Sequence, residues 1–502
     1  MRVYLEPDRK SDLGDATPRA VRVHRRGFSA GLVVAFGLSL AAMSPAAAQT
    51  LQESLGLAYR GNPTLLGEQA NQRAVTENSA QARSGWRPTV SVNMDANYQQ
   101  GPYTSAFALG TFTSNYAEGY VSAKQTLYSF GHVANQVRAA DARSRAEGEN
   151  LRLTESQVFT AAISAYMDVL RDRYVLDVRV ADLEMLVRQV RLITSRYNLG
   201  GAPGEQVTRT DVEQAETRRR SAEVALTQAR ATLAASEANF RAVIGVMPAQ
   251  LTMPEGLPGL PPSIEQAVRE AIAANPQLAQ TREMKSATEA DIDTARSQWG
   301  PQIQVQGLLG TVGPAAPFRG HEYSEQVSGT VSLVQPLYNG DLYNAQIRQA
   351  RDKDEQARQN LEQARRVALQ DVVTSWRAVE NGLQAIQAGT AEVRSGETTL
   401  KGYQVEYGYG LRSTTDVLYA DQNLRAAQVD LATSRHDTIV AEAKLLAAIG
   451  RLQARDLLPG VQHYDSGAAL HRARTRGWEP LQTPIAALDR VGWSSGPTGE
   501  SK

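Results

Sequence analysis

Three stretches of the chain alternate between apolar and polar residues with the period of a β-strand that has one apolar face. They run from Thr89 to Tyr98, from Gln302 to Leu309 and from Gln326 to Leu333, and a fourth stretch, Tyr116 to Leu127, alternates less clearly. Strands of about ten residues, joined by polar Gly/Thr/Ser-rich loops, are typical of a lipid-facing barrel wall. A half-buried sheet in a soluble protein has the same period.

One face of each of these strands is apolar. One face carries Val90, Val92, Met94, Ala96 and Tyr98 in the first strand, Ile303, Val305, Gly307 and Leu309 in the second, and Val327, Gly329, Val331 and Leu333 in the third. About four strands are expected per chain, whereas a closed barrel needs roughly eight or more. Several copies of the chain are therefore expected to pool their strands.

Two other segments predict helices of unusual length. Residues 131–198 and 340–407 each run for 68 residues without proline, and at 1.5 Å per residue each helix would span about 100 Å. The segments from Leu51 to Gly85 and from about Gln206 to Gly245 are roughly half as long. Two of these shorter helices stacked end to end would match one long helix.

The last helical segment shows how such helices pack. Its large residues recur every seven positions, and each of the first five is followed three positions later by a small one. The large set is Val417, Leu424, Leu431, Thr438, Leu445 and Leu452, and the small set is Ala420, Ala427, Ser434, Ala441 and Ala448. Residues 212–240 repeat this pattern, broken by Arg219. The other faces are polar, which is expected where both the outside and a lumen are wet, although an antiparallel coiled coil has the same pattern.

The same motifs occur twice, in the same order. The pairs are Asn62-Pro63 and Asn275-Pro276, Trp86-Arg87-Pro88 and Trp299-Gly300-Pro301, Gln125-Thr126-Leu127-Tyr128 and Gln335-Pro336-Leu337-Tyr338, Tyr197 with Gly200 and Tyr407 with Gly410, Asp211-Val212 and Asp416-Val417, and Ile244-Gly245 and Ile449-Gly450. Their offset falls from 213 through 210 to 205 residues, and about five extra residues at 201–205 account for most of the drift. The sequence therefore predicts a duplicated unit of helix, strand pair, very long helix and shorter helix.

The expected organisation follows from these boundaries. Residues 1–48 are predicted to be a signal peptide, since basic residues precede an apolar run from Phe28 to Met43 and an Ala46-Ala47-Ala48 cleavage site; a membrane anchor is the alternative. Residues 49–252 are the first repeat, 253–262 a Pro/Gly linker and 263–458 the second repeat. The tail, residues 459–502, is expected either to be disordered or to wrap the outside of the helices.

Composition removes several classes of function. The chain has 53 basic and 53 acidic residues without a basic stripe, so no nucleic-acid partner is expected. It contains no cysteine, which excludes disulfides, thiolate metal sites and a lipidated N-terminal cysteine. Outside the N-terminus there is no apolar run of about 18 residues, so any membrane crossing is expected through strands. No P-loop, HExxH or GxSxG motif is present and the six histidines are scattered, so no catalytic, cofactor-binding or metal-binding residue is predicted.

The duplicated motifs resemble those of the TolC family of outer-membrane export ducts over residues 51 to about 458. The carriers are the Asn-Pro and Trp-x-Pro pairs, the two Gln-x-Leu-Tyr motifs, residues 208–212 (Thr-Arg-Thr-Asp-Val) and residues 407–418 (Tyr-x-x-Gly-x-Arg-x-x-x-Asp-Val-Leu). The resemblance implies an α+β membrane protein: a homotrimer whose twelve pooled strands form one outer-membrane β-barrel, continued by a long periplasmic α-helical coiled-coil barrel. It also implies outer-membrane lipid, a periplasmic adaptor protein and an inner-membrane transporter of the ABC or RND type as partners.

The resemblance also assigns candidate site residues. Tyr407 and Arg412 would be gate links, Thr210 and Asp211 their partners on the first-copy helix, and Asp416 the acid that lines the aperture. The family pattern has a second aspartate three residues further on, where this chain has Tyr419, so one acidic ring is expected. As alternatives, Asp416 is a solvated acid at a helix N-terminus, Tyr407 packs, and Arg412 forms a surface ion pair.

The resulting functional hypothesis is a passive outer-membrane exit duct and not an enzyme. The absence of a lipidated cysteine favours the type I protein secretion branch over multidrug or metal efflux, which is the first alternative. A non-channel periplasmic coiled-coil scaffold is the alternative from another class.

Overall fold

The computed structural model describes residues 49–105, 108–199, 207–315, 322–477 and 482–491. The chain divides into two units, Met1–Ala46 and Ala47–Lys502, and every described residue lies in the second. The expected signal peptide and the five-residue insertion at 201–205 lie outside the described residues.

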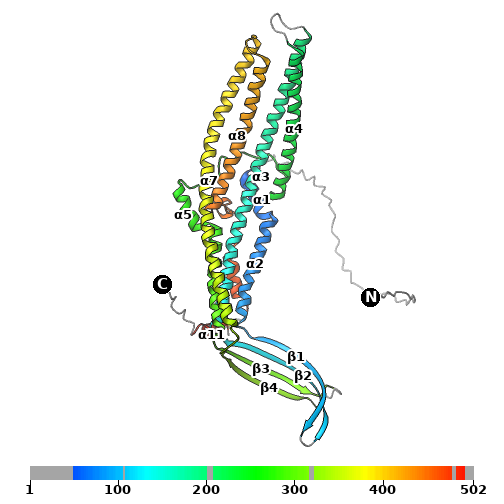
Figure 1. Cartoon of the computed structure of the whole chain (residues 1–502), viewed down its shortest axis with the longest axis vertical. Helices are drawn as coiled ribbons and strands as arrows, with labels where there is room; N and C mark the ends of the chain where they lie inside the picture. Colours follow the sequence, from blue (N-terminus) through cyan, green and yellow to red (C-terminus); the bar gives the residue numbers. More distant parts are fainter. Residues whose placement is uncertain (1–48, 106–107, 200–206, 316–321, 478–481, 492–502) are drawn as a thin grey trace, which may run out of the picture. The chain divides into compact units, whose positions relative to one another are not determined.

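The order of elements repeats along the chain (Figure 1). The first series is α1 (Leu51–Gly61), α2 (Pro63–Ser84), β1 (Thr89–Ser105), β2 (Ala108–Tyr128), α3 (His132–Asn198) and α4 (Arg209–Ile244). The second is α5 (Ile264–Ala274), α6 (Pro276–Ser297), β3 (Gln302–Gly313), β4 (Ser324–Val334), α7 (Leu342–Gly408) and α8 (Thr414–Ala448). The chain continues with α9 (Ala454–Leu457), α10 (Ser466–Thr475) and α11 (Gln482–Asp489).

The four strands form one antiparallel sheet in the order β1-β2-β3-β4, so β1 and β4 are its edges. The register aligns Val92 with Val121, Val121 with Leu309, and Leu309 with Val327. These four residues form an apolar row across the sheet, and each is 43–75% exposed. Within the described part of the chain, no element covers this face, so it is available to lipid or to another molecule.

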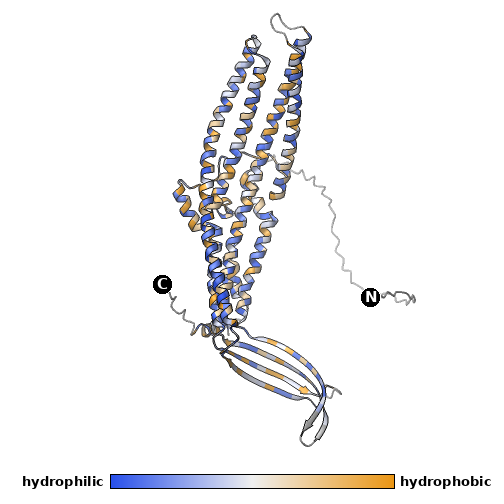
Figure 2. Cartoon of the chain, in the orientation of Figure 1, coloured by the Kyte–Doolittle hydropathy of each residue, from blue (hydrophilic) through white to orange (hydrophobic). Residues whose placement is uncertain are grey.

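The two long helices, α3 and α7, have 67 residues each. Both α4 and α2 pack along α3, both α8 and α6 contact α7, and α3 also contacts α8 and α6. The predicted end-to-end stacking of short helices is therefore confirmed. Polar and apolar residues are mixed along each long helix (Figure 2). In the described part of the chain, no helix has the length and apolar character needed to cross a membrane.

The duplicated Asn-Pro pair explains how the short helices meet. The sequence predicts one helix from Leu51 to Gly85, but this prediction is wrong, because Asn62 ends α1 and caps α2. Its Oδ1 accepts from the Thr64 amide at 2.9 Å, and its Nδ2 donates to the Val243 carbonyl near the end of α4 at 2.9 Å. Pro63 has no amide to donate, which suits the first helical position.

Asn275 plays the same role in the second series. Its side chain caps α6 and donates to the Ala448 carbonyl at the end of α8 at 2.8 Å. The repeated motif therefore holds the end of one helix against the start of another in both halves.

The largest core lies where these helix ends meet. It is centred on side chains from α3, α4 and α8, of which Phe159, Tyr166, Phe240 and Leu446 are at most 1% exposed. The Tyr166 hydroxyl lies 2.9 Å from the Gln49 carbonyl oxygen and 2.7 Å from that of Thr252. The core thus also anchors the chain before α1 and after α4.

Glycines form a seven-residue repeat on α7 that the sequence reasoning missed. Gly382, Gly389 and Gly396 face Thr438, Leu431 and Leu424 of α8 respectively. A Cβ at Gly389 or Gly396 would lie 3.4 or 3.3 Å from the facing leucine, so the absence of a side chain allows the two helices to approach closely. The large residues predicted on α8 therefore meet glycine positions on α7.

The repeated Trp and Gln motifs meet where helices pass into strands. Gln125 Nε2 donates to the Trp86 carbonyl at 3.1 Å, and Gln335 Nε2 donates to the Trp299 carbonyl at 2.6 Å. The surroundings differ, because Trp86 is 2% exposed and donates from Nε1 to Asp489, whereas Trp299 packs edge-on against Tyr343.

The tail folds back on the first series. α10 contacts α2 and α3, and α11 contacts β2 and α3. Arg474 forms an ion pair with Asp141 of α3 at 2.7 Å, and Arg476 forms one with Glu77 of α2. The described part of residues 459–502 therefore contains two helices, α10 and α11, that lie against the rest of the chain.

Candidate functional site at the free ends of the long helices

The starts of α4 and α8 are built alike, at the end of the long helices away from the strands (Figure 1). Thr208 and Asp211 form a capping box at α4, and Ser413 and Asp416 form one at α8. Asp416 Oδ2 accepts from the Ser413 amide at 3.0 Å and from its hydroxyl at 2.9 Å. Asp211 makes the same two contacts with Thr208 at 2.8 Å each.

These hydrogen bonds stabilise the ionised carboxylates. The Ser413 hydroxyl and then its amide lower the pKa of Asp416, and the Thr208 amide and then its hydroxyl lower that of Asp211. Both acids also sit in the first helical turn, where the helix dipole favours negative charge. Each aspartate is thus a helix cap and a charge that persists to low pH.

Tyr407, near the end of α7, joins the hairpin formed by α7 and α8 to the hairpin formed by α3 and α4. Its hydroxyl accepts from Arg196 Nη1 of α3 at 2.7 Å and from Thr414 Oγ1 of α8 at 3.2 Å. The Arg196 guanidinium also lies over the Tyr407 ring, 4.8 Å from its centroid, in cation–π geometry.

Arg412, between α7 and α8, contacts residues of α7. Its Nε lies 2.7 Å from Glu406 Oε2, and its guanidinium lies 4.3 Å from the centroid of the Tyr403 ring. The hydrogen bond from Arg412 to Glu406 is the main cause of a raised pKa for this arginine. The connection from α7 to α8 is therefore held by local contacts.

The other candidates lie on the same surface. Thr210 is exposed in the first turn of α4, and Tyr419, one turn into α8, is 61% exposed. Among the described residues of one chain, Tyr407 contacts Arg196 and Thr414, and Arg412 contacts Glu406 and Tyr403. Neither is seen to contact Thr210 or Asp211 within that part of the chain. The gate links between these four residues stay a prediction, as does the pore-lining role of Asp416 and Tyr419.

Sequence reasoning missed Arg196, Tyr403 and Glu406. Arg196 directly precedes Tyr197, which is a marker of the duplication, and this neighbourhood is the one signal that could have pointed to it. Nothing in the sequence separates Tyr403 or Glu406 from other residues of α7.

Apolar clusters fix α8 beneath these polar contacts. Val417 and Leu424 pack with Leu400 of α7, and Leu418 packs with Leu186 of α3 and Ala222 of α4. The start of α8 is thereby attached both to its own hairpin and to the other one.

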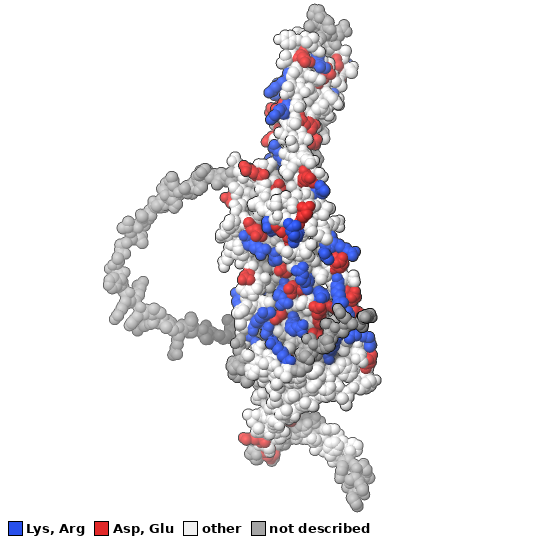
Figure 3. Space-filling view, turned by 90° about the vertical axis from the view of Figure 1, so that its left-hand side faces the viewer, with Lys and Arg blue, Asp and Glu red and all other residues white. Residues whose placement is uncertain are grey.

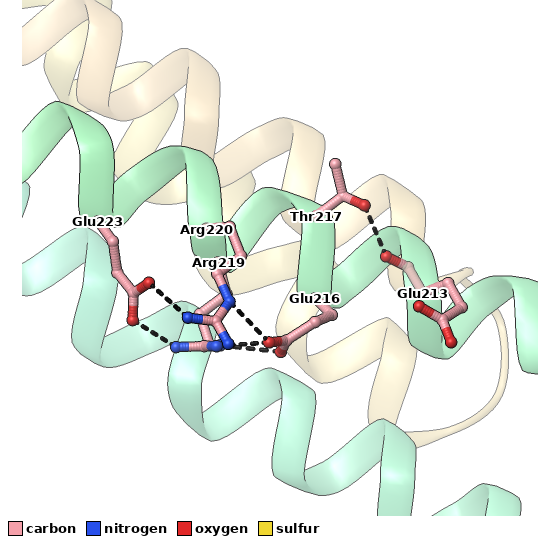
Figure 4. Close-up of polar contacts among 6 residues, drawn as sticks. All are labelled: Glu213, Glu216, Thr217, Arg219, Arg220 and Glu223. Atoms are coloured by element: carbon pink, nitrogen blue, oxygen red, sulfur yellow. Dashed lines mark hydrogen bonds and ion pairs between the residues drawn. The ribbon is translucent and has the colours of Figure 1, made fainter.

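A polar cluster occupies the break in the α4 heptad pattern. Figure 4 shows Arg219 and Arg220 between the carboxylates of Glu216 and Glu223. Arg219 is 17% exposed and pairs with both glutamates, while Arg220 lies 3.1 Å from Glu216 and 3.3 Å from Glu223. The hydrogen bond from Arg219 lowers the pKa of Glu216 to about 2. An arginine at a seam position of α4 is thus paired with two glutamates one turn away on the same helix, as in the side-chain pairs that stabilise single helices.

A second polar contact joins the two hairpins further along. His436 of α8, 8% exposed, lies with Nε2 3.0 Å from Asp168 Oδ1 of α3 and with Nδ1 2.8 Å from Asp437 Oδ1. Arg171 of α3 pairs with the same Asp168 at 3.0 Å.

Charge is distributed unevenly over the chain. The four strands contain four charged residues, Asp95, Glu118, Lys124 and Glu325. Charges of both signs lie side by side over the helical part, and most of the strand region in view is uncharged (Figure 3). Within the described residues, no group of three or more His, Cys, Asp or Glu could hold a metal ion.

Most of the chain matches a known family profile and several known proteins. The profile described as "Outer membrane efflux protein" matches residues 54–246 and 267–451. The outer membrane efflux protein BepC of Brucella suis is 29% identical over 88% of this chain and 93% of its own. The outer membrane protein TolC of Escherichia coli is 26% identical over 85% and 87%. The alkaline protease secretion protein AprF of Pseudomonas aeruginosa is 23% identical over 87% and 93%.

Solved structures share the fold. A membrane protein from Pseudomonas aeruginosa superposes with a TM-score of 0.71 at 19% identity, covering 82% of this chain and 92% of its own. The Campylobacter jejuni CmeC outer membrane channel gives 0.70 at 13% identity, covering 85% and 89%. The predicted fold class, strands of three copies closing a barrel that long helices continue, is confirmed by this likeness together with the four strands and long helices of the chain.

Proposed function

The chain belongs to the outer membrane efflux protein family, and from that premise we propose that it is the exit duct of a type I protein secretion system. Members of this family are outer-membrane channels and not enzymes, and they work as homotrimers with an adaptor protein and an inner-membrane transporter. The chain is accordingly an outer-membrane channel with a large periplasmic helical part. Residues 1–48 would direct its export as a signal peptide.

Two observations support protein secretion as the task. A relative that matches over 87% of this chain is named for the secretion of a protease. The chain also lacks a cysteine that could be lipidated, as expected of the non-lipidated branch. The inner-membrane partner would then be an ABC-type transporter.

Efflux of small molecules is a second candidate, because a more similar relative, at 29% identity, is named an efflux protein. The partner transporter would then be of the RND type. Deletion of the gene separates the two, since loss of a secreted protein from the medium supports the first and increased sensitivity to toxic small molecules, with secretion unchanged, supports the second.

The geometry that carries the channel proposal is the pair of 67-residue helices that continue a sheet whose apolar face is uncovered. Three copies would bring three Asp416 carboxylates together at the helix ends to form one acidic ring, which would attract cations. Tyr407, Arg196, Arg412 and Glu406 would hold the closed state. Docking of the transporter would shift the equilibrium to the open state, so the duct needs no energy source of its own.

Exposed apolar residues at the same ends support docking to an adaptor. Leu199 is 82% exposed at the end of α3, and Tyr409 and Leu411 between α7 and α8 are 81% and 74% exposed. An apolar tip that no described residue covers is a candidate protein-binding surface.

Single-channel conductance of the purified trimer in a planar bilayer tests the duct. Wild-type protein is expected to show small cation-preferring openings that divalent cations block, and Asp416→Ala is expected to lose this block. Ser413→Ala is the matched control, because it removes the cap and leaves the carboxylate. A verified trimer without conductance would sink the channel proposal, whereas an unchanged block in Asp416→Ala would remove only the aperture assignment.

A further inference from the structure

The repeated Gln-x-Leu-Tyr motif has very different surroundings in its two copies. Leu127 packs against the cluster of Trp86, Val133, Val137 and Ile485, and the Tyr128 hydroxyl donates to the Val491 carbonyl at 3.0 Å. The equivalent residues of the second copy, Leu337 and Tyr338, are 86% and 84% exposed. The tail therefore covers the first motif, and no described residue of the chain covers the second.

The uncovered motif is part of a larger apolar patch at the end of β4. Val334 is 59% exposed and Leu342, at the start of α7, is 53% exposed. We call Val334, Leu337, Tyr338 and Leu342 the β4 patch. Large apolar side chains exposed together at one end of a strand mark a candidate interaction surface.

A second apolar surface lies on the outer flank of the tail. Pro484, Leu488 and Val491 are four and three residues apart, so they share one side of the α11 turn and its continuation. All three are exposed, Leu488 at 49% and Val491 at 64%. The adjacent flank, with Ile485 and Asp489, is buried against the first series. We call the three exposed residues the α11 stripe.

The sheet topology places these two surfaces at the same end of the strands. The register pairs Tyr128 with Ile303 and Gln302 with Val334, so β2 and β4 finish at the same end of the sheet. The α11 stripe lies at the end of β2 because Val491 contacts Tyr128.

Closure of the barrel places the β4 patch beside the neighbouring copy. The edges of the sheet are β1 and β4, so in a trimeric barrel β4 of one copy lies beside β1 of the next. α11 sits over the β1–β2 side, because Asp489 contacts Trp86 just before β1 and Val491 contacts Tyr128. The β4 patch therefore lies at the seam between copies, and the chain's own α11 leaves it uncovered, so the neighbour's α11, which reaches Trp86 just before the β1 edge, is its candidate cover.

We propose that the β4 patch of one copy docks on the α11 stripe of the neighbouring copy, so that the C-terminal segment links adjacent copies where the helices pass into the strands. The contact would give Leu337 and Tyr338 the apolar cover that Leu127 and Tyr128 receive within one chain. This inference rests on the proposed trimeric duct and adds the residues that join its copies.

Cysteine crosslinking tests the contact directly, because the chain contains no cysteine of its own. The double variant Tyr338→Cys/Leu488→Cys, purified as the full-length trimer, is treated with a short bismaleimide and run on a denaturing gel. Covalent dimers and trimers are expected. The matched control Tyr128→Cys/Leu488→Cys joins residues of one chain, so it should remain monomeric on the gel, as should each single variant.

The outcomes distinguish this inference from the proposed function. If the double variant runs as a native trimer and conducts but gives no covalent dimer, the docking contact is wrong. A thiol at position 338 that is shielded from maleimide in lipid vesicles but reactive in detergent would then identify lipid as the cover. If no trimer forms and no conductance appears from the wild-type chain, the proposed function fails and this inference falls with it. A second variant, Tyr338→Asp, should lower the temperature at which the native trimer dissociates.

Discussion

The carboxylate of Asp489 accepts a hydrogen bond from the backbone amide of Ser129 at 2.7 Å, although 360 positions separate the two residues. It also accepts from the Ser129 hydroxyl at 2.8 Å, from the Ala134 amide at 3.3 Å and from Trp86 Nε1 at 3.2 Å. The N-cap position of α3 is Gly131, which has no side chain to cap the helix. The tail therefore supplies the cap that α3 lacks.

Asp489→Ala is expected to lower the free energy of unfolding by about 1–3 kcal/mol, because it leaves buried amides and an indole N–H without their acceptor. The measurement is denaturant unfolding followed by the helical circular dichroism signal. Asp456→Ala, an exposed acid that pairs with Arg455 at 3.5 Å, is the control and should change the free energy by less than about 1 kcal/mol. Equal effects of the two variants would contradict the capping role.

Tyr407→Phe is expected to raise the open probability of the channel. The change deletes the hydroxyl that accepts from Arg196 and Thr414 and keeps the ring under the guanidinium. A hydrogen bond from a charged donor contributes about 1–2 kcal/mol here, which is roughly a 5- to 30-fold shift in an equilibrium. Single-channel recording measures the shift, and Tyr409→Phe, at a position 81% exposed, is the control. An open probability equal to that of wild type would remove Tyr407 from the gate.

The sequence predicts the elements of this fold well because the signals are long and periodic. The long helices are found within two residues of their predicted ends, since an apolar and polar pattern without proline over 68 residues leaves no alternative. The break at Asn62 is missed because this residue both ends α1 and caps α2. The two helices are therefore separated by a single residue and look like one helix in the sequence pattern.

The candidate site is predictable only in part. Asp416 and Tyr407 lie in a motif that occurs twice, whereas Arg196 reaches Tyr407 from 211 positions away through the packing of α3 beside α8. The cap that Asp489 provides to α3 likewise comes from a residue far away in the sequence. Neither contact has a local signature, because each depends on which helices become neighbours.

Gly382→Ala is expected to destabilise the chain. An added Cβ would lie 3.2 Å from Thr438 Cβ and closer still to its Oγ1, and overpacking of this kind costs about 1–3 kcal/mol. Gly402 provides the matched control on the same helix, because a Cβ there has nothing within 4 Å. Gly402→Ala should therefore stabilise α7 by about 0.5–1 kcal/mol through helix propensity.

A compensating change tests the cause. Thr438→Ala in the Gly382→Ala background removes Oγ1, the atom closest to the added Cβ, so it should recover most of the lost stability in denaturant titration. If Gly382→Ala stabilises as Gly402→Ala does, close approach of α7 and α8 is not what the glycine provides.

His436 links α8 to α3 in a way that depends on its charge. Its ring lies between the carboxylates of Asp168 and Asp437, with Arg171 also paired to Asp168. Burial acts to lower the pKa of His436, but the hydrogen bonds to Asp168 and Asp437 outweigh it, so the pKa is raised above 6.5. The protonated ring can pair with both carboxylates at once, through the Nδ1 hydrogen bond to Asp437 and the 3.0 Å ion-pair contact of Nε2 with Asp168.

The sign of the pH effect follows from this raised pKa. A histidine whose pKa is higher in the folded state contributes stability that is fully present below about pH 6.5 and is lost as pH rises through the folded-state pKa. The wild-type chain should therefore lose stability relative to His436→Gln as the pH rises above about 6.5, by on the order of 1 kcal/mol, because deprotonation removes the positive charge that pairs with Asp168. Thermal unfolding over this pH range measures the difference. His471→Gln, at an exposed position of α10, should run parallel to wild type. If the curves of wild type and His436→Gln keep a constant separation over this range, His436 is neutral in the folded state and the two hairpins are joined by packing alone.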